Sequence, residues 1–189
     1  MYRVLLVDDE TLIREAISEN TKWNELGYEL AGACKNGKEA KAFVENNKVD
    51  LLLTDICMPF CDGIELAKFV YENYKSIKVV IISGYDEFEY AKKAVKYQVV
   101  DYILKPITAQ ELSETLIKIK ENLDEENTKI QNIEKIRRAY VRNLPLLRGR
   151  FLDGFLCGKI STELFEEKMG DYGVELSGTQ FASAIIVED

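Results

Sequence analysis

Histidine is absent from the 189 residues of this chain, and proline and tryptophan are scarce, with three residues and one residue. Without histidine the chain cannot be a histidine kinase or a histidine phosphotransfer module, and it has no histidine general base. Long apolar runs are also missing, since none approaches the roughly 20 residues that cross a bilayer. Met1 leads directly into a predicted strand, so we expect no signal peptide, no membrane partner and a cytoplasmic location.

Cysteines and basic residues are few as well. The four cysteines are Cys34, Cys57, Cys61 and Cys157, and their spacing does not match a zinc site. We expect them to be reduced thiols of a cytosolic protein. Lys and Arg total 25 against 33 Asp and Glu, which gives a net charge of −8. Because contacts to nucleic-acid phosphates need a basic surface, we do not expect this chain to bind DNA by itself.

The chain does contain short apolar runs that end on charged or polar residues. Residues 51–55 are three leucines and a threonine followed by Asp55. A run of this length indicates a strand that is buried on both faces. Three further runs have the same form: 4–10 ends on three acidic residues, 79–84 on a Ser-Gly pair, and 99–106 on a Lys-Pro pair.

Helical patterns separate these runs. We expect strands near 2–7, 28–34, 51–55, 79–83 and 99–105, and helices that begin near 11, 37, 63, 87 and 109. Strands that alternate with helices at this spacing form a parallel, doubly wound sheet of the α/β class. In the first helix, Leu12 and Ile13 are expected to belong to the core.

The carboxyl ends of neighbouring parallel strands meet at one edge of a sheet, where ligands bind. This edge would carry Asp8, Asp9, Asp55, Ser83 and Lys105. Clustered carboxylates repel each other unless cations lie among them. Lys105 supplies one cation, and a bound metal with oxygen ligands, which suits Mg²⁺, would supply another. Taken alone, Asp55 could instead be a helix N-cap or an Asx-turn residue.

The order of these motifs resembles the receiver domain of bacterial two-component response regulators. The matching residues are Asp8-Asp9, Asp55, Met58-Pro59, Asp62-Gly63, Ser83-Gly84, Tyr102 and Lys105-Pro106. The resemblance covers residues 1 to about 124 and implies a flavodoxin-like sheet of five parallel strands in the order 2-1-3-4-5. Residues 21–27, 36–40 and 83–88 are similar to the branch whose receivers control AraC-type DNA-binding domains.

The resemblance also implies a role for each site residue. Asp55 would be the phosphorylation site and would take a phosphoryl group from a sensor histidine kinase. Lys105 would bind Asp55 before the transfer and a phosphoryl oxygen after it, and a cis bond before Pro106 would fix the lysine backbone. The Mg²⁺ ligands would be Asp8, Asp9, Asp55 and the backbone carbonyl of Cys57.

Ser83 and Tyr102 are expected to form the switch. After phosphorylation the Ser83 hydroxyl would donate to a phosphoryl oxygen and Tyr102 would turn inward. The alternatives are a turn-capping hydroxyl and a half-buried strand aromatic. Cys57 and Tyr85 would control dephosphorylation, because they flank the approach of water and neither is an acid or amide that orients it. We therefore expect slow loss of the phosphoryl group.

Beyond residue 109, apolar residues recur in alternating steps of three and four. This heptad stripe consists of Leu112, Leu116, Ile119, Leu123, Ile130, Ile133, Tyr140, Leu144 and Leu147. It predicts a homodimer through the 112–147 helix, with Glu126 and Arg137 as polar interruptions. The helix 4–strand 5–helix 5 face is a second candidate for the homodimer. An ordinary amphipathic helix that packs within its own chain is the alternative.

The last part of the chain has a different pattern. Pro145 is expected to break or kink the helix. A further helix near 150–157 and a strand at 181–187 follow. The expected domains are a receiver at 1–124, a coiled-coil-like linker at 125–147, and the truncated start of a second α/β domain at 148–189.

Two regulatory functions fit this organisation. The first is a phosphorylation-controlled transcription regulator whose helix-turn-helix part lies beyond residue 189, and which is not an enzyme. The second is a regulator that acts by protein–protein contact without DNA. A third class, phosphohydrolases with an aspartate nucleophile, usually places a second Asp two residues after the nucleophile, where this chain has Cys57. A sequence beyond residue 189 would separate the first two.

Overall fold

The protein is described by a computed structural model that covers residues 1–84 and 88–175. The predicted strand at 181–187 and the side chain of Tyr85 lie outside these residues. The strands are β1 (Tyr2–Val7), β2 (Tyr28–Cys34), β3 (Leu51–Asp55), β4 (Lys78–Ser83) and β5 (Asp101–Leu104). They form one parallel sheet in the order β2-β1-β3-β4-β5. The predicted flavodoxin-like order is confirmed.

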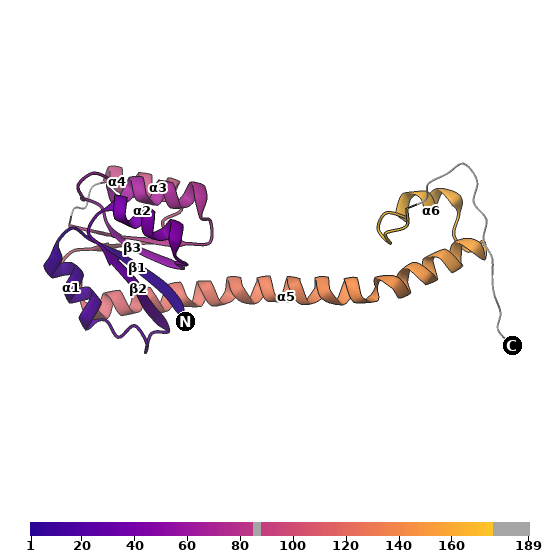
Figure 1. The fold of residues 1–189 in the computed structure, drawn as a ribbon, viewed down its shortest axis with the longest axis horizontal. Helices are drawn as coiled ribbons and strands as arrows, with labels where there is room; N and C mark the ends of the chain where they lie inside the picture. Colours follow the sequence, from indigo (N-terminus) through magenta and orange to yellow (C-terminus); the bar gives the residue numbers. More distant parts are fainter. Residues whose placement is uncertain (85–87, 176–189) are drawn as a thin grey trace. The chain divides into compact units, whose positions relative to one another are not determined.

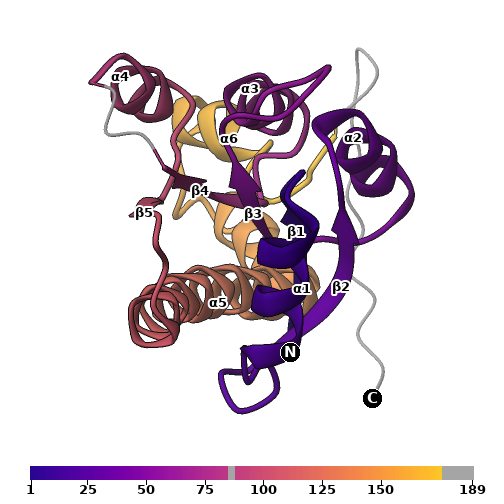
Figure 2. The same cartoon turned by 90° about the vertical axis from the view of Figure 1, so that its left-hand side faces the viewer.

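Helices cover both faces of this sheet. They are α1 (Thr11–Asn20), α2 (Gly37–Asn46), α3 (Gly63–Asn73), α4 (Phe88–Lys96), α5 (Ala109–Leu156) and α6 (Thr162–Lys168). Figure 2 shows α1 and the start of α5 on one face and α2, α3 and α4 on the other. Side-chain caps fix the starts of α2 and α3, because Asn36 accepts from the Glu39 N–H at 2.8 Å and Asp62 accepts from the Glu65 N–H at 2.6 Å.

The strands divide their side chains between two apolar clusters. Val4 and Leu6 of β1 face α1 and α5, whereas Leu5 and Val7 face α2 and α3. All four are fully buried. This alternation follows from the two-residue period of a strand, and burial on both faces explains why the runs read as continuously apolar.

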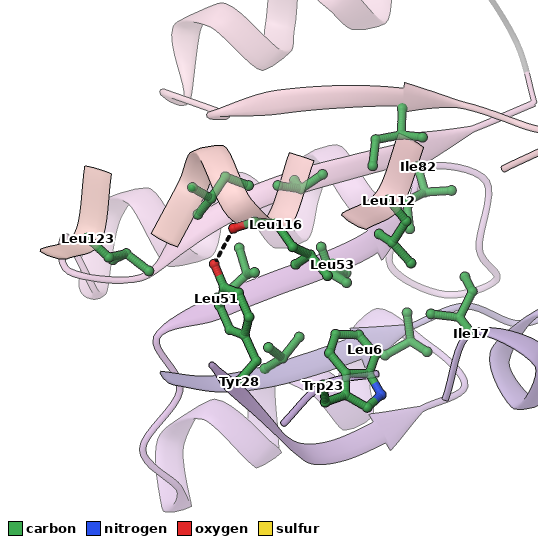
Figure 3. Packing of buried hydrophobic residues seen from close by; sticks show 14 residues of the cluster. Leu6, Ile17, Trp23, Tyr28, Leu51, Leu53, Ile82, Leu112, Leu116 and Leu123 are labelled. Carbon is green, nitrogen blue, oxygen red and sulfur yellow. Dashed lines mark hydrogen bonds between the residues drawn. The ribbon is translucent and has the colours of Figure 1, made fainter. Parts of the chain in front are cut away.

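The first half of the heptad stripe belongs to the receiver core. Leu112, Leu116, Ile119 and Leu123 are at most 5% exposed and pack on the sheet (Figure 3). The hydroxyl of Tyr28 donates to the carbonyl of Leu116 at 2.8 Å and ties β2 to the helix. For these residues the prediction of a homodimer contact is wrong, and the alternative of packing within the chain is right.

Leu12 is also misplaced by the sequence pattern. Its side chain is 81% exposed, while Ile13 is half-buried and Ile17 is buried against the sheet. Residues 13 and 17 are four apart and share one face of α1, and residue 12 lies about 100° away from that face. The expectation that Leu12 belongs to the core is therefore wrong.

Helix α5 continues far past the sheet (Figure 1). The chain divides into two compact units, Met1–Glu125 and Glu126–Asp189, and α5 contributes to both. Pro145, where the sequence predicts a break or a kink, lies inside α5, and the helix is not broken there because it ends only at Leu156. Proline removes a single backbone donor, and on its C-terminal side Phe151 is buried against Phe165 of α6. Within the described residues, no helix is long and apolar enough to span a membrane.

The second unit has a small aromatic core. Phe151 stacks on Tyr172 with 4.2 Å between ring centroids and on Phe165 with 5.1 Å. The Tyr140 hydroxyl donates to the carbonyl of Asp171 at 2.6 Å, and Arg148 donates to the carbonyl of Tyr172 at 3.0 Å. Near the end of the heptad stripe, Tyr140 is thus bound to the segment after α6, while Leu144 and Leu147 are half-buried.

Candidate functional site

Three carboxylates converge at the carboxyl edge of the sheet. Asp8 and Asp9 follow β1, and Asp55 ends β3. These strands are parallel neighbours in which Val7 pairs with Thr54, so the residues after them emerge side by side. One carboxylate oxygen from each aspartate lies within 4.8 Å of the others. The sequence places these three residues at one edge, and the structure brings them together.

Lys105 lies at the centre of this acidic group. Its Nζ is 3.1 Å from Oδ2 of Asp8, 3.1 Å from Oδ2 of Asp55 and 3.2 Å from Oε1 of Glu10. Burial of the lysine would lower its pKa, but the nearby carboxylates of Asp8 and Asp55 outweigh that effect and hold the pKa above its usual range. Lys105 is therefore a permanent cation, and the bond to Pro106 is cis as the resemblance implies.

The Asp8 carboxylate lies in an unfavourable environment for its charge. It is completely buried, and burial raises its pKa against the opposing effects of Lys105 and of the Glu10 N–H, which donates to Oδ1 at 2.8 Å. Its Oδ2 has the ammonium of Lys105 nearby but no aligned hydrogen-bond donor. A buried carboxylate oxygen without a hydrogen-bond donor is unfavourable, and a second cation bound beside it would stabilise it. Asp8, Asp9 and Asp55 together offer the oxygen ligands that suit a divalent ion such as Mg²⁺.

The Asp55 carboxylate is fixed in orientation. Its Oδ1 accepts from the Ile56 N–H at 2.7 Å, and its Oδ2 accepts from Lys105 at 3.1 Å. The side chain is 6% exposed. Gly63 packs directly against the backbone of Asp55, because a Cβ on Gly63 would clash with the carbonyl oxygen of Asp55. The Asp55 carboxylate is thus held in one orientation by the surrounding chain.

The other predicted residues surround this centre. Ser83 ends β4 and is 1% exposed, and its carbonyl accepts from the Lys105 N–H at 2.7 Å. Tyr102 pairs with Ile81 in the sheet and is half-buried. Cys57 is exposed two residues after Asp55. Tyr85 lies outside the described residues.

Two residues at the site were not predicted from the sequence. Glu10 reaches Lys105, and Arg14 donates from Nη1 to the carbonyl of Asp8 at 2.8 Å. Glu10 is the third acid of its run, so its position is a usable signal. Arg14 lies six residues after Asp8, and its contact depends on the turn between β1 and α1, which composition does not reveal.

Comparison with known proteins agrees with the site. The family model "Response regulator receiver domain" matches residues 4–117. The chain is 36% identical over 162 residues to the uncharacterized transcriptional regulatory protein YesN of Bacillus subtilis, covering 85% of this chain and 43% of that one. It is 30% identical to the transcriptional regulatory protein HptR of Staphylococcus aureus, covering 82% and 60%. The chain therefore spans about half the length of these relatives.

Solved structures show the same receiver fold. The REC domain of AraT, a response regulator from Geobacillus stearothermophilus, is 41% identical with a TM-score of 0.63, over 67% of this chain and 98% of that one. A two-component transcriptional regulator AraC from Clostridium phytofermentans is 31% identical with a TM-score of 0.62, over 67% and 98%. With its acidic edge, its central lysine and a family match over residues 4–117, this chain belongs to the response regulator receiver family of two-component systems.

Proposed function

We propose that this chain is the phosphoacceptor part of a two-component transcription regulator. Asp55 takes a phosphoryl group from the phosphohistidine of a sensor histidine kinase. The observation that carries this proposal is the Asp55 carboxylate, fixed between the Ile56 N–H and Lys105 inside a cluster of three acids. Such a site needs no covalent help beyond the nucleophile, because phosphoryl transfer depends on positioning and charge neutralisation.

The chemistry follows from these contacts. A carboxylate oxygen of Asp55 attacks phosphorus, the phosphorus–nitrogen bond of the phosphohistidine breaks, and the bonding electrons leave with the imidazole. Mg²⁺, when bound, neutralises charge on the phosphoryl oxygens. Asp8, Asp9, Asp55 and the backbone carbonyl of Cys57 are its proposed ligands. Lys105 first binds the Asp55 carboxylate and afterwards binds a phosphoryl oxygen, so it stabilises both states.

The same edge supplies the proposed switch. The buried Ser83 hydroxyl lies at the end of the strand next to Asp55, where it can donate to a phosphoryl oxygen. Half-buried Tyr102 on β5 turns inward when the segment after β4 moves. Exposed Cys57 leaves the approach of water without an acid or amide to orient it, and Tyr85 is the second proposed control of dephosphorylation.

The output of the switch is proposed from the relatives. Curated relatives carry the words "transcriptional regulatory protein" in their names, and this chain covers about half of their length. We infer that DNA is contacted by a helix-turn-helix part outside this chain, and that a homodimer presents it. The proposed domains are the receiver at 1–124, a linker at 125–147 and the start of a second domain at 148–189. Regulation by protein contact alone is the second candidate.

Phosphorylation of the purified chain tests the central proposal. Incubation with acetyl phosphate and Mg²⁺ should add one phosphoryl group to the wild type, measured by intact mass, and none to Asp55→Ala. The control is Asp153→Ala, which removes an exposed carboxylate from the second unit and should be labelled like the wild type. Chelation of Mg²⁺ should abolish labelling. Full labelling of Asp55→Ala would contradict the assignment.

A further inference from the structure

Phe60 is an unusual residue beside the phosphoacceptor. Its side chain is 90% exposed, the highest value among the large hydrophobic residues that the structure describes. Its backbone has a φ of +70°, in the left-handed region that side chains with a Cβ rarely adopt. Both the backbone conformation and the exposure of a phenyl ring are unfavourable in the isolated chain.

The loop that carries Phe60 is closed and anchored. It leaves the sheet after Asp55 and returns where the Gly63 N–H donates to the carbonyl of Ile56 at 2.9 Å. Met58 and Cys61, on either side of the tip, are 8% and 5% exposed and belong to the core cluster under α2 and α3. The ring of Phe60 is thus presented to solvent from a fixed loop, a few residues from the Asp55 carboxylate.

We propose that Phe60 is the apolar contact by which a phosphohistidine-bearing donor protein docks over Asp55. This inference rests on the proposed phosphoacceptor function. To bring phosphorus to Asp55, the donor surface must cover the rim of the site, and the tip of this loop is part of that rim. Aromatic anchors held in place before binding dominate protein interfaces, because they bury much area and lose little freedom.

The charge of the rim favours a protein donor over other occupants. Asp9 is exposed beside Asp55, and Glu10, which contacts Lys105, is 60% exposed, so the rim of the site carries acidic groups. Nucleic acid would bring more negative charge to this edge. A second copy of the chain, placed edge to edge, would bring like charges together. A donor protein that buries the phenyl ring brings neither the phosphate backbone of nucleic acid nor the matching acidic edge of a second copy.

The variant Phe60→Gly tests this role without straining the loop, since glycine adopts a positive φ readily. The donor is a purified, autophosphorylated sensor-kinase cytoplasmic domain that transfers to the wild-type chain. Phe60→Gly should lower kcat/KM for that transfer by at least about tenfold, mostly through KM. Labelling by acetyl phosphate should stay within about twofold, and Phe60→Tyr should recover most of the transfer. The chain should remain at least as stable.

The matched control is Val95→Ala. Val95 is 79% exposed near the C-terminal end of α4, away from the carboxyl edge of the sheet that carries Asp55. The Val95→Ala variant should leave kinase transfer unchanged. Unchanged kinase transfer in Phe60→Gly would overturn the inference. If Phe60→Gly lost acetyl phosphate labelling as much as kinase transfer, the site itself would be damaged and the inference would also be overturned. Dissociation of a homodimer by Phe60→Gly in sedimentation would overturn it as well. Failure of acetyl phosphate to label wild-type Asp55 would instead contradict the proposed function.

Discussion

Asp8 shows how a functional group can oppose stability. Its carboxylate is fully buried, its pKa is raised by burial, and one oxygen lacks an aligned donor. Lys105 offsets part of this cost but is shared with Asp55 and Glu10. A group that only balanced the lysine would not need to be so deeply desolvated. The proposed Mg²⁺ at the same edge would account for its position.

Replacement of Asp8 by Asn should separate stability from metal binding. The folded-state pKa of Asp8 is above 3.8, so its charge costs stability once the pH exceeds 3.8 and costs nothing well below it. In metal-free buffer, Asp8→Asn should therefore be more stable than the wild type at pH 7 by about 1 kcal/mol or more. The gap should close as the pH falls towards 3.

Urea unfolding at the two pH values with a chelator present measures this gap, and calorimetry with Mg²⁺ measures binding. Asp8→Asn should bind Mg²⁺ at least about tenfold more weakly, because one ligand loses its charge. Asp153→Asn, which changes an exposed carboxylate of the second unit, is the control and should alter neither quantity. A less stable Asp8→Asn at pH 7 would contradict the idea that burial of Asp8 is costly.

At the scale of elements, the loop between β3 and α3 is built around Gly63. The Asp62 side chain caps α3, and the next residue must be glycine because a Cβ there would clash with the carbonyl oxygen of Asp55. This backbone oxygen cannot move without moving Asp55, the proposed phosphoacceptor. The start of α3 and Asp55 are therefore positioned by the same close approach.

Gly63→Ala should cost about 1–3 kcal/mol of stability, because the methyl group forces a backbone shift in a packed region. It should also slow labelling of Asp55 by acetyl phosphate. Gly149→Ala is the matched control, since a Cβ there meets nothing within 4 Å and the residue lies inside α5. That control should be stabilising by about 0.5–1 kcal/mol. Equal stability of Gly63→Ala and wild type would show that the loop can yield.

Much of this layout is predictable from the sequence, and the misses have physical causes. The strands can be recognised in the sequence because burial on both faces requires apolar runs such as Leu51–Leu53. Strand ends then place Asp8, Asp55 and Lys105 at one edge. Leu12 misled because a hydrophobic residue in a helix need not face the core. Phe60 gave no signal, because neither its φ nor its exposure depends on residue type alone.

At the scale of the whole molecule, the residues of the heptad stripe lie in three different environments. Its first four residues are receiver core, and Tyr140, Leu144 and Leu147 precede the aromatic core of the second unit. A continuous stripe in the sequence therefore did not mean one continuous interface. Between these parts, Ile130, Ile133 and Ile136 are 55%, 65% and 70% exposed. This central segment of α5 is the exposed apolar part of the helix and the candidate contact for a partner.

We propose that a second copy of the chain covers the central segment. In the heptad, Ile130 and Ile133 occupy the seam, with Lys129, Glu134, Ile136 and Val141 in the flanking positions. In a parallel, in-register pair, Lys129 lies beside Glu134 of the other copy, and Ile136 lies beside Val141. Opposite charges and apolar side chains thus meet their complements. Arg137 in the seam weakens the contact, so association should depend on concentration.

Two isoleucine variants distinguish this interface from the α4–β5–α5 face of the receiver. Sedimentation of the wild type with a phosphoryl mimic should show a dimer, and Ile133→Glu should make it monomeric by placing like charges in the seam. Ile117→Glu is the counterpart, because Ile117 is 48% exposed on the receiver part of α5, off the stripe. It should leave the dimer intact. Loss of the dimer only in Ile117→Glu would assign the contact to the receiver face. A wild type that stays monomeric at high concentration, with and without the mimic, would remove the homodimer altogether.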